Sequence, residues 1–114
     1  MDEVLQIGPL EIRPAEFLAL ADGVPLRLTP HELDLLTALA RRAGRIVSRE
    51  ELFDVVWNRA RRADDRSVDV YVRKLRRKLA DAVPEWECIH THFGFGYRFS
   101  PEPSHLFHTP TTHR

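Results

Sequence analysis

The segment of residues 65–81 most constrains the fold, because it predicts a helix with two chemically opposite faces. At about 100° per residue, one face gathers within roughly a 60° arc four aliphatic side chains, Val68, Val72, Leu75 and Leu79. The opposite side carries Arg66, Asp69, Val70, Arg73 and Arg77, and its flanks carry Ser67, Lys74, Arg76 and Lys78. The aliphatic stripe must face a core, so the cationic side faces solvent or a partner.

The charge of the chain is concentrated around this helix. The 114 residues have a formal net charge of zero, yet residues 59–78 contain nine Lys or Arg and only three Asp or Glu. A local excess of cations on a neutral chain indicates a footprint for a polyanion. A solvated helix face accounts for the same pattern, and charge alone leaves both interpretations open.

Two further helices are predicted upstream from their start signals. Each begins with a capping box in which a hydroxyl residue is followed three positions later by Glu, at Thr29-Pro30-His31-Glu32 and Ser48-Arg49-Glu50-Glu51. We expect the first helix to end near Ala43, with Gly44 as its stop, and to bury Leu33, Leu36, Leu39 and Ala43. We expect the second helix over residues 49–57, burying Leu52, Val55 and Val56.

Short strands flank the three helices. Residues 4–7, 10–13, 17–20 and 24–28 read as an antiparallel meander separated by Gly and Pro turns, and residues 88–92 and 97–99 read as a hairpin. The fold class is therefore α+β, a winged helix-turn-helix with an N-terminal four-stranded antiparallel sheet, three helices and a C-terminal β-hairpin wing. We assign residues 1–100 to this domain and residues 101–114 to a tail that contains Pro, Thr and His.

Composition argues against several other classes. No run approaches the roughly 20 apolar residues that span a bilayer, and an acidic N-terminus with one cysteine predicts a cytoplasmic protein. There is no phosphate loop or nucleophile motif, so we expect neither an enzyme nor a cofactor. Cys88, His90 and His92 alternate along a strand and have zinc-binding chemistry, but a fourth ligand is missing, and we expect no metal.

The outward side of the third helix suits duplex DNA. A major groove about 12 Å wide accepts one helix, and Arg66, Arg73 and Arg77 offer planar donors for phosphates or a guanine edge. Val70 is an apolar residue among these charges, which a thymine methyl group would explain, although a chance valine on a wet face is an equal alternative. We expect Asp69 to orient an arginine, with ordinary solvation as the alternative.

Four blocks of sequence resemble the OmpR/PhoB-type effector domain of bacterial response regulators. They are LTPHELDLL at 28–36, VSREELFDVVW at 47–57, DRSVDVYVRKLRRKL at 65–79 and IHTHFGFGYRF at 89–99. The resemblance covers about residues 4–99 and implies sequence-specific binding of duplex DNA by a regulator of the two-component type. It also implies head-to-tail dimers on direct repeats. We expect no receiver domain before the meander, because too few residues precede it, and the sequence leaves open whether the chain is a fragment or a stand-alone regulator.

Matching positions in the family imply roles for individual residues. The resemblance assigns phosphate or base contacts through the recognition helix, residues 65–81, to Arg66, Ser67, Tyr71, Arg73, Lys74 and Arg76. It assigns contacts with the surrounding backbone to Trp57, Thr91 and Tyr97. Loop 58–64 corresponds to the family's contact with RNA polymerase, and its arginines equally suit flanking phosphates.

The wing, residues 88–99, departs from the family at Phe93. The family has an arginine there that enters the minor groove, whereas phenylalanine cannot neutralise a narrow, negative groove. Phe93 can wedge against sugars, pack on a neighbouring subunit, or fill space on the hairpin, and we favour the last. We expect weak minor-groove recognition and tighter binding after Phe93→Arg.

A winged helix that only contacts proteins is the main rival function. Protein interfaces deplete Lys and enrich large apolar anchors at their centre, and helix 65–81 does the reverse. We therefore favour DNA binding. The sequence does not indicate the operator, the regulated genes, activation as opposed to repression, or the oligomeric state in solution.

Overall fold

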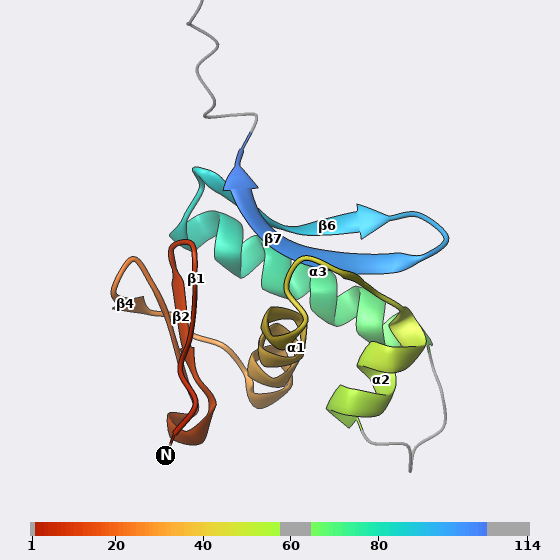
Figure 1. Ribbon diagram of the computed structural model, residues 1–114, viewed down its shortest axis with the longest axis horizontal. Helices are drawn as coiled ribbons and strands as arrows, with labels where there is room; N and C mark the ends of the chain where they lie inside the picture. Colours follow the sequence, from red (N-terminus) through yellow and green to blue (C-terminus); the bar gives the residue numbers. More distant parts are fainter. Residues whose placement is uncertain (1, 58–64, 105–114) are drawn as a thin grey trace, which may run out of the picture.

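Two antiparallel sheets enclose a layer of three helices (Figure 1). The computed structural model describes residues 2–57 and 65–104, and for residues 65–67 it describes the backbone alone. Helix α1 (Pro30–Arg41) lies at the centre and packs against α2 (Arg49–Trp57), α3 (Asp65–Ala82) and the N-terminal sheet. No helix in the described ranges is long and apolar enough to cross a bilayer. This architecture confirms the predicted α+β winged helix-turn-helix.

The N-terminal sheet has the order β1-β2-β3-β4, formed by β1 (Leu5–Ile7), β2 (Leu10–Arg13), β3 (Leu18–Ala21) and β4 (Val24–Pro25). Leu10 and Ile12 point into the core, whereas the residues between and after them are half-buried, as predicted from their alternation. Strand β4 is shorter than expected and lies at the sheet edge, where Pro25 is tolerated. Residues Pro14–Glu16 form a 3-10 turn between strands.

Helix α1 begins at its predicted capping box. The Thr29 hydroxyl accepts from the Glu32 amide, and the Glu32 carboxylate accepts from the Thr29 amide at 2.9 Å. The helix ends at Arg41, earlier than expected, and Ala43 is exposed, so the prediction that it is buried was wrong. Leu33, Leu36 and Leu39 are buried as predicted.

Helix α2 has the predicted bounds but only half of its predicted cap. The Ser48 hydroxyl accepts from the Glu51 amide at 3.0 Å, but the Glu51 carboxylate accepts hydrogen bonds from Arg42 and Arg45 instead of returning to the cap. Two long guanidinium donors compete for that carboxylate, and local sequence did not indicate them. Leu52 is buried as predicted and Val56 partly so, whereas Val55 is 46% exposed and Phe53 takes its place in the core.

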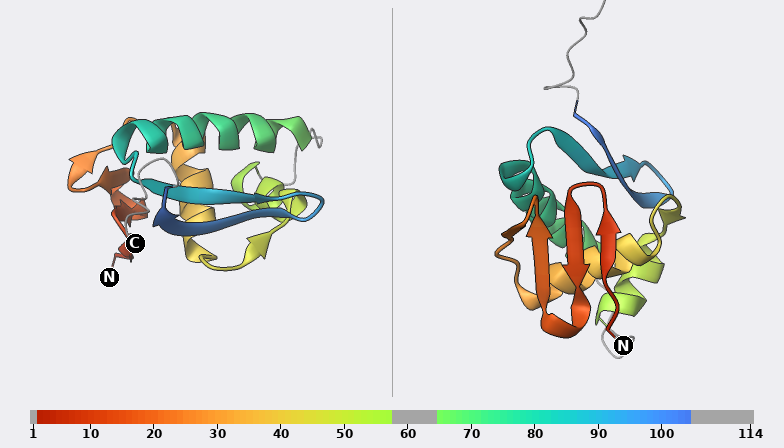
Figure 2. Two further views of the ribbon diagram at one scale, coloured as in Figure 1. Left: turned by 90° about the horizontal axis from the view of Figure 1, so that it is seen from above. Right: turned by 60° about the vertical axis from the view of Figure 1, so that its left-hand side comes forward.

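Helix α3 runs one residue beyond its predicted end, and its aliphatic stripe is buried as predicted. Val68, Val72, Leu75 and Leu79 are between 0% and 4% exposed. Figure 2 shows α3 alongside the C-terminal hairpin, whose tip extends toward the N-terminal end of the helix. The hairpin is longer than expected, because β6 (Trp86–His92) pairs with β7 (Gly96–Pro103), which continues past residue 100.

A third strand, which the sequence did not reveal, completes the C-terminal sheet. Strand β5 (Ile46–Val47), between α1 and α2, pairs with β7 in the order β5-β7-β6. Gly96 makes this pairing possible. Its φ is +139°, and a Cβ at this position would overlap the Val47 carbonyl. The wing is therefore braced against the helical layer by a glycine contact.

We expect Gly96→Ala to lower the free energy of unfolding by about 3 kcal/mol, because the added methyl group collides with backbone that cannot move alone. Chemical denaturation measures this change. Gly23→Ala is the matched control: Gly23 also has positive φ, but open space surrounds it, so strain of about 1 kcal/mol is expected. Equal losses in the two variants would contradict the role assigned to Gly96.

Candidate nucleic-acid interface

The outward face of α3 carries cations and one apolar side chain. Arg73, Lys74 and Arg77 are exposed, and none forms a salt bridge with another described residue. Val70 lies among them and is 36% exposed. Arg66 and Ser67 belong to the first turn of α3, but their side chains lie outside the described part of the chain. The opposite stripe is buried, so this cationic surface faces outward as predicted.

A hollow of about 370 Å³ separates α3 from the wing. Arg73 and Arg76 line one side of it, and Thr91, Phe93 and Gly94 line the other. The structure thereby brings predicted site residues from the recognition helix and from the wing onto one surface. A strand of phosphates lying in this hollow would meet donors from both elements.

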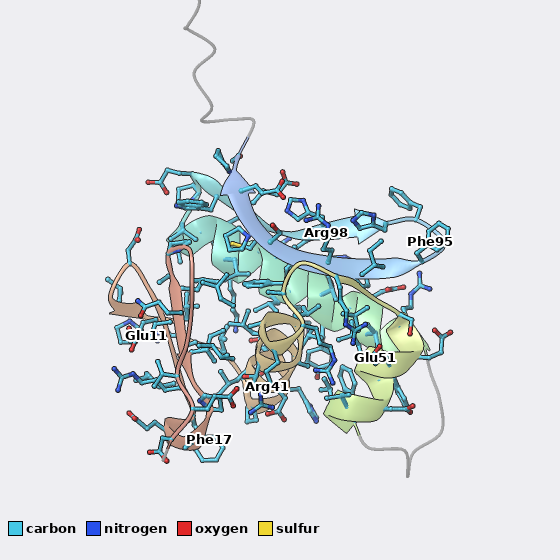
Figure 3. All side chains as sticks on the ribbon, in the orientation of Figure 1. Glu11, Phe17, Arg41, Glu51, Phe95 and Arg98 are labelled. Atoms are coloured by element: carbon cyan, nitrogen blue, oxygen red, sulfur yellow. The ribbon has the colours of Figure 1, made fainter. Side chains whose placement is uncertain are left out.

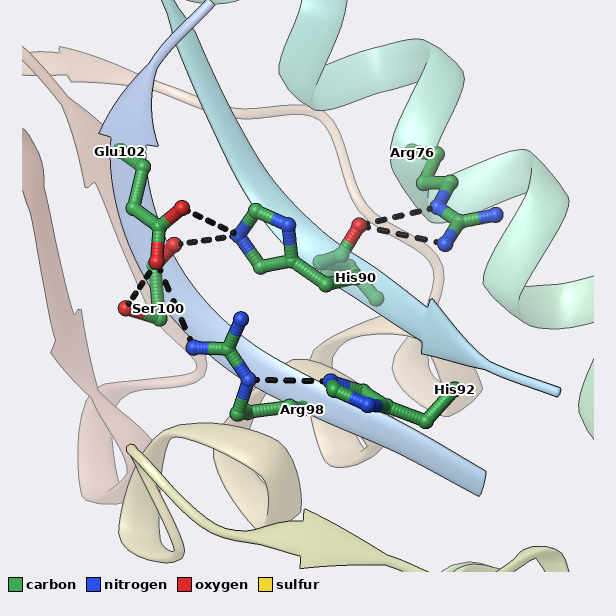
Figure 4. A network of polar contacts seen from close by, with 7 residues as sticks. Arg76, His90, His92, Arg98, Ser100 and Glu102 are labelled. Carbon is green, nitrogen blue, oxygen red and sulfur yellow. Dashed lines mark hydrogen bonds and ion pairs between the residues drawn. The ribbon is translucent and has the colours of Figure 1, made fainter. Parts of the chain in front are cut away.

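Arg76, a predicted DNA contact, forms hydrogen bonds within the protein. Its guanidinium donates to the Ile89 carbonyl at 3.1 Å and to the Thr91 hydroxyl at 2.5 Å (Arg76 is labelled in Figure 4). It also lies 5.7 Å from the centre of the Tyr97 ring. Arg76 therefore ties α3 to β6, and its side chain is half-buried. Helical position alone did not distinguish it from the exposed cations.

Asp69 joins three elements at the base of the hollow. Its Oδ1 accepts from Arg49 of α2 at 2.9 Å and from the Tyr97 hydroxyl of β7 at 2.5 Å. Burial raises the pKa of the Asp69 carboxyl, but the hydrogen bonds from Tyr97 and Arg49 outweigh it, and the pKa lies below its usual value. The prediction that Asp69 orients an arginine is confirmed. Tyr97 is only 7% exposed, so its role in the structure is to position the wing.

Trp57 and Tyr71 belong to an aromatic cluster that sequence reasoning missed. The Trp57 ring lies 5.4 Å from those of both His31 and Tyr71, and 5.8 Å from that of Phe53. The Lys74 ammonium lies 5.1 Å from the centre of the Tyr71 ring. The cluster links α1, α2 and α3 beside the cationic surface. Aromatic residues on all three helices were the available signal, but only their packing shows that they meet.

A second hollow, of about 510 Å³, opens between the start of α1 and α3, and Lys74 and Arg77 are among its lining residues. At its edge, the Lys78 ammonium contacts Glu32 Oε1 at 2.6 Å and the Arg27 carbonyl at 2.8 Å. Burial raises the pKa of Glu32, whose side chain is 2% exposed, but bonds from Lys78 and Thr29 leave it below its usual value. Lys78 is thus neutralised, whereas Lys74 and Arg77 are available to an external anion.

The three side chains considered for zinc do not converge. A shift in pairing register between Glu87 and Ile89 breaks the alternation, and Cys88 is buried in the core, where desolvation raises the pKa of its thiol to about 11. His90 contacts the Ser100 carbonyl, and His92 accepts from Arg98 (Figure 4). In the described ranges, no group of three or more His, Cys, Asp or Glu is placed to hold a metal ion.

The fold and the surface together define a winged helix-turn-helix with a cationic recognition helix, and comparisons identify its family. A family model described as "Transcriptional regulatory protein, C terminal" matches residues 23–99. The chain is 41% identical over 95 residues to the transcriptional regulatory protein CreB of Escherichia coli K12, covering 82% of this chain and 41% of CreB. The chain spans about two-fifths of the length of the curated relatives it matches.

Solved structures agree with this match. The DNA-binding domain of CpxR from E. coli has a TM-score of 0.75 and 34% identity, covering 86% of this chain and 96% of that domain. The RstA DNA-binding domain of Klebsiella pneumoniae, solved in complex with the RstA box, has a TM-score of 0.76 and 33% identity, covering 88% and 99%. The chain belongs to the C-terminal domain family of transcriptional regulatory proteins, the OmpR/PhoB type that its sequence resembles.

We expect Tyr97→Phe to destabilise the protein by about 1–2 kcal/mol at pH 7, because it removes a hydrogen bond to a carboxylate. The expected loss is near the lower limit for a hydrogen bond to a charged group, because the Asp69 side chain is 37% exposed and solvent screens the interaction. Since folding lowers the pKa of Asp69, its stabilising contribution is complete above about pH 4 and is lost as pH falls through the folded-state value.

Chemical denaturation of both proteins at pH 7 and pH 3 tests this expectation. The difference between wild type and Tyr97→Phe should shrink at pH 3. A double-mutant cycle with Asp69→Asn provides the control. Because both substitutions remove the same interaction, the double variant should lose less unfolding free energy than the two single variants lose in total. A constant difference across pH would show that the hydroxyl acts without Asp69.

Proposed function

We propose that this chain binds duplex DNA sequence-specifically, as the effector domain of a bacterial transcription regulator of the two-component type. The observation that carries the proposal is the orientation of α3, which buries its aliphatic stripe and leaves Arg73, Lys74 and Arg77 exposed and without salt bridges to described residues. The relative RstA, whose corresponding domain is solved with the RstA box, supports it. The setting is the cytoplasm, where chromosomal DNA is accessible.

In this proposal α3 enters the major groove and the wing lies on the adjacent backbone or minor groove. Arg73 and Arg77 bind phosphates or a guanine edge, and Val70 meets a thymine methyl group. Arg66 and Ser67 serve the same groove from the first turn. Trp57 and Tyr71 support the helix from one side, and Arg76, Thr91 and Tyr97 support the wing from the other.

A protein-binding module without DNA affinity is the alternative. Such a surface needs an apolar centre, whereas Val70, an exposed apolar residue of α3, lies among cations. Within residues 65–97, every Lys and Arg belongs to α3, because residues 79–97 contain none. This arrangement favours, as the binding partner, a polyanion whose groove accepts a single helix.

Binding of a duplex should weaken with salt, because each neutralised phosphate contributes a slope of about −0.9 in log affinity against log salt. Arg73→Ala and Arg77→Ala should each weaken binding several-fold and reduce the slope by about 0.9. Arg41→Ala is the control, since Arg41 forms an ion pair with Glu3 at 2.5 Å, away from α3. Fluorescence anisotropy at several salt concentrations measures both quantities. A wild-type protein that ignores all duplexes at low salt would refute the proposal.

Binding as a head-to-tail dimer is a further part of the proposal. Selection of binding sites from random duplexes should enrich direct repeats whose centres are about one helical turn apart, roughly 10–10.5 base pairs. Enrichment of palindromes would instead indicate a two-fold symmetric dimer. The predicted contact with RNA polymerase falls on loop 58–64, which lies outside the described residues, and stays a prediction.

A further inference from the structure

The tip of the wing exposes two phenylalanines. Phe93 is 87% exposed and Phe95 is 72% exposed, so neither fills space on the hairpin, contrary to the interpretation we favoured from sequence. Figure 3 shows Phe95 at the end of the hairpin, at the opposite corner of the molecule from Phe17. Two exposed aromatic side chains in one turn are costly unless a partner covers them, because each buries about 150–250 Å² when packed.

A hydrogen-bonded turn forms the tip. The Phe95 amide donates to the His92 carbonyl at 2.8 Å, and Gly94, at the third position of this turn, has a φ of +86°. These are the features of a type II turn, which places Phe93 at its second position. Below the tip, Gly96 packs on β5, and Arg76 holds Thr91 against α3. A braced tip loses little conformational entropy on docking.

The tip belongs to the same surface as the recognition helix. Phe93 and Gly94 line the hollow whose opposite side is formed by Arg73 and Arg76. When α3 occupies a major groove, an element across this hollow lies over the phosphate strand that separates the major groove from the minor groove. Since no Lys or Arg occurs in residues 79–97, the tip brings apolar surface and no cation to that place.

We propose that Phe93 and Phe95 form an apolar wedge that enters the minor groove beside the α3 site, packs on deoxyribose and base edges, and bends the duplex. Apolar side chains that insert between base steps unstack them partially and kink DNA toward the major groove. This inference rests on the proposed function. It adds a source of affinity that depends on shape and DNA deformability rather than on counterion release.

The test uses a duplex carrying a single repeat from the selected sites, labelled at both ends for energy transfer. Phe93→Ala and Phe95→Ala should each weaken binding about tenfold, which is about 1.4 kcal/mol, and reduce the bend, because each removes apolar surface that the duplex covers. The slope of log affinity against log salt should not change, because no cation is removed. Phe17→Ala is the matched control: Phe17 is 82% exposed on the N-terminal side, and its loss should alter neither quantity.

The variant Phe93→Arg distinguishes the effect of apolar insertion on the bend from the effect of added charge on affinity. It should steepen the salt slope by about 0.9 and tighten binding at low salt, yet reduce the bend. Wild-type affinity and bend in both alanine variants would overturn the wedge while leaving duplex binding intact. A loss confined to two-repeat duplexes, seen as reduced cooperativity, would overturn it in favour of contact with a second copy of the chain. Absence of wild-type binding would refute the proposed function itself.

Discussion

Burial of the aliphatic stripe of α3 is the interaction on which the rest of the structure depends. Its four side chains are almost fully removed from solvent. Each contributes about 1.5–3 kcal/mol, and rotating the helix would expose them while forcing guanidinium groups into the core. This sets the rotation of α3 about its axis. The exposure of Arg73, Lys74 and Arg77 follows directly, because they occupy the other side of the same helix.

The cations around α3 fall into two groups with different structural roles. Arg49, Arg76 and Lys78 contact Asp69, the wing backbone and Glu32, and so hold α2, α1 and the wing in place around the helix. Arg73, Lys74 and Arg77 make no salt bridge with a described residue and remain available to an external polyanion. The first group fixes α3 relative to its neighbours, and this fixed position presents the exposed cations of the second group in a defined arrangement.

The errors in the sequence-based predictions share a physical origin. Val55 has helical spacing for burial, yet Phe53 packs inward, because the orientation of α2 depends on its packing against α1 and α3. Glu51 has the position of a capping residue, yet two arginines from the preceding turn bind its carboxylate. Strand β5 has only two residues, too few for a periodic signal, and exists because β7 passes beside it.

By itself, the sequence determined the three helices, the stripe that turns α3 inward, the hairpin and the local excess of cations, because these depend on side chains a few positions apart. Tertiary structure alone decided which cations form contacts within the protein, that Cys88 is buried, and that Phe93 is exposed at the tip of the wing. Those outcomes depend on contacts between residues distant along the chain. Their partners are selected by packing, which no local pattern encodes.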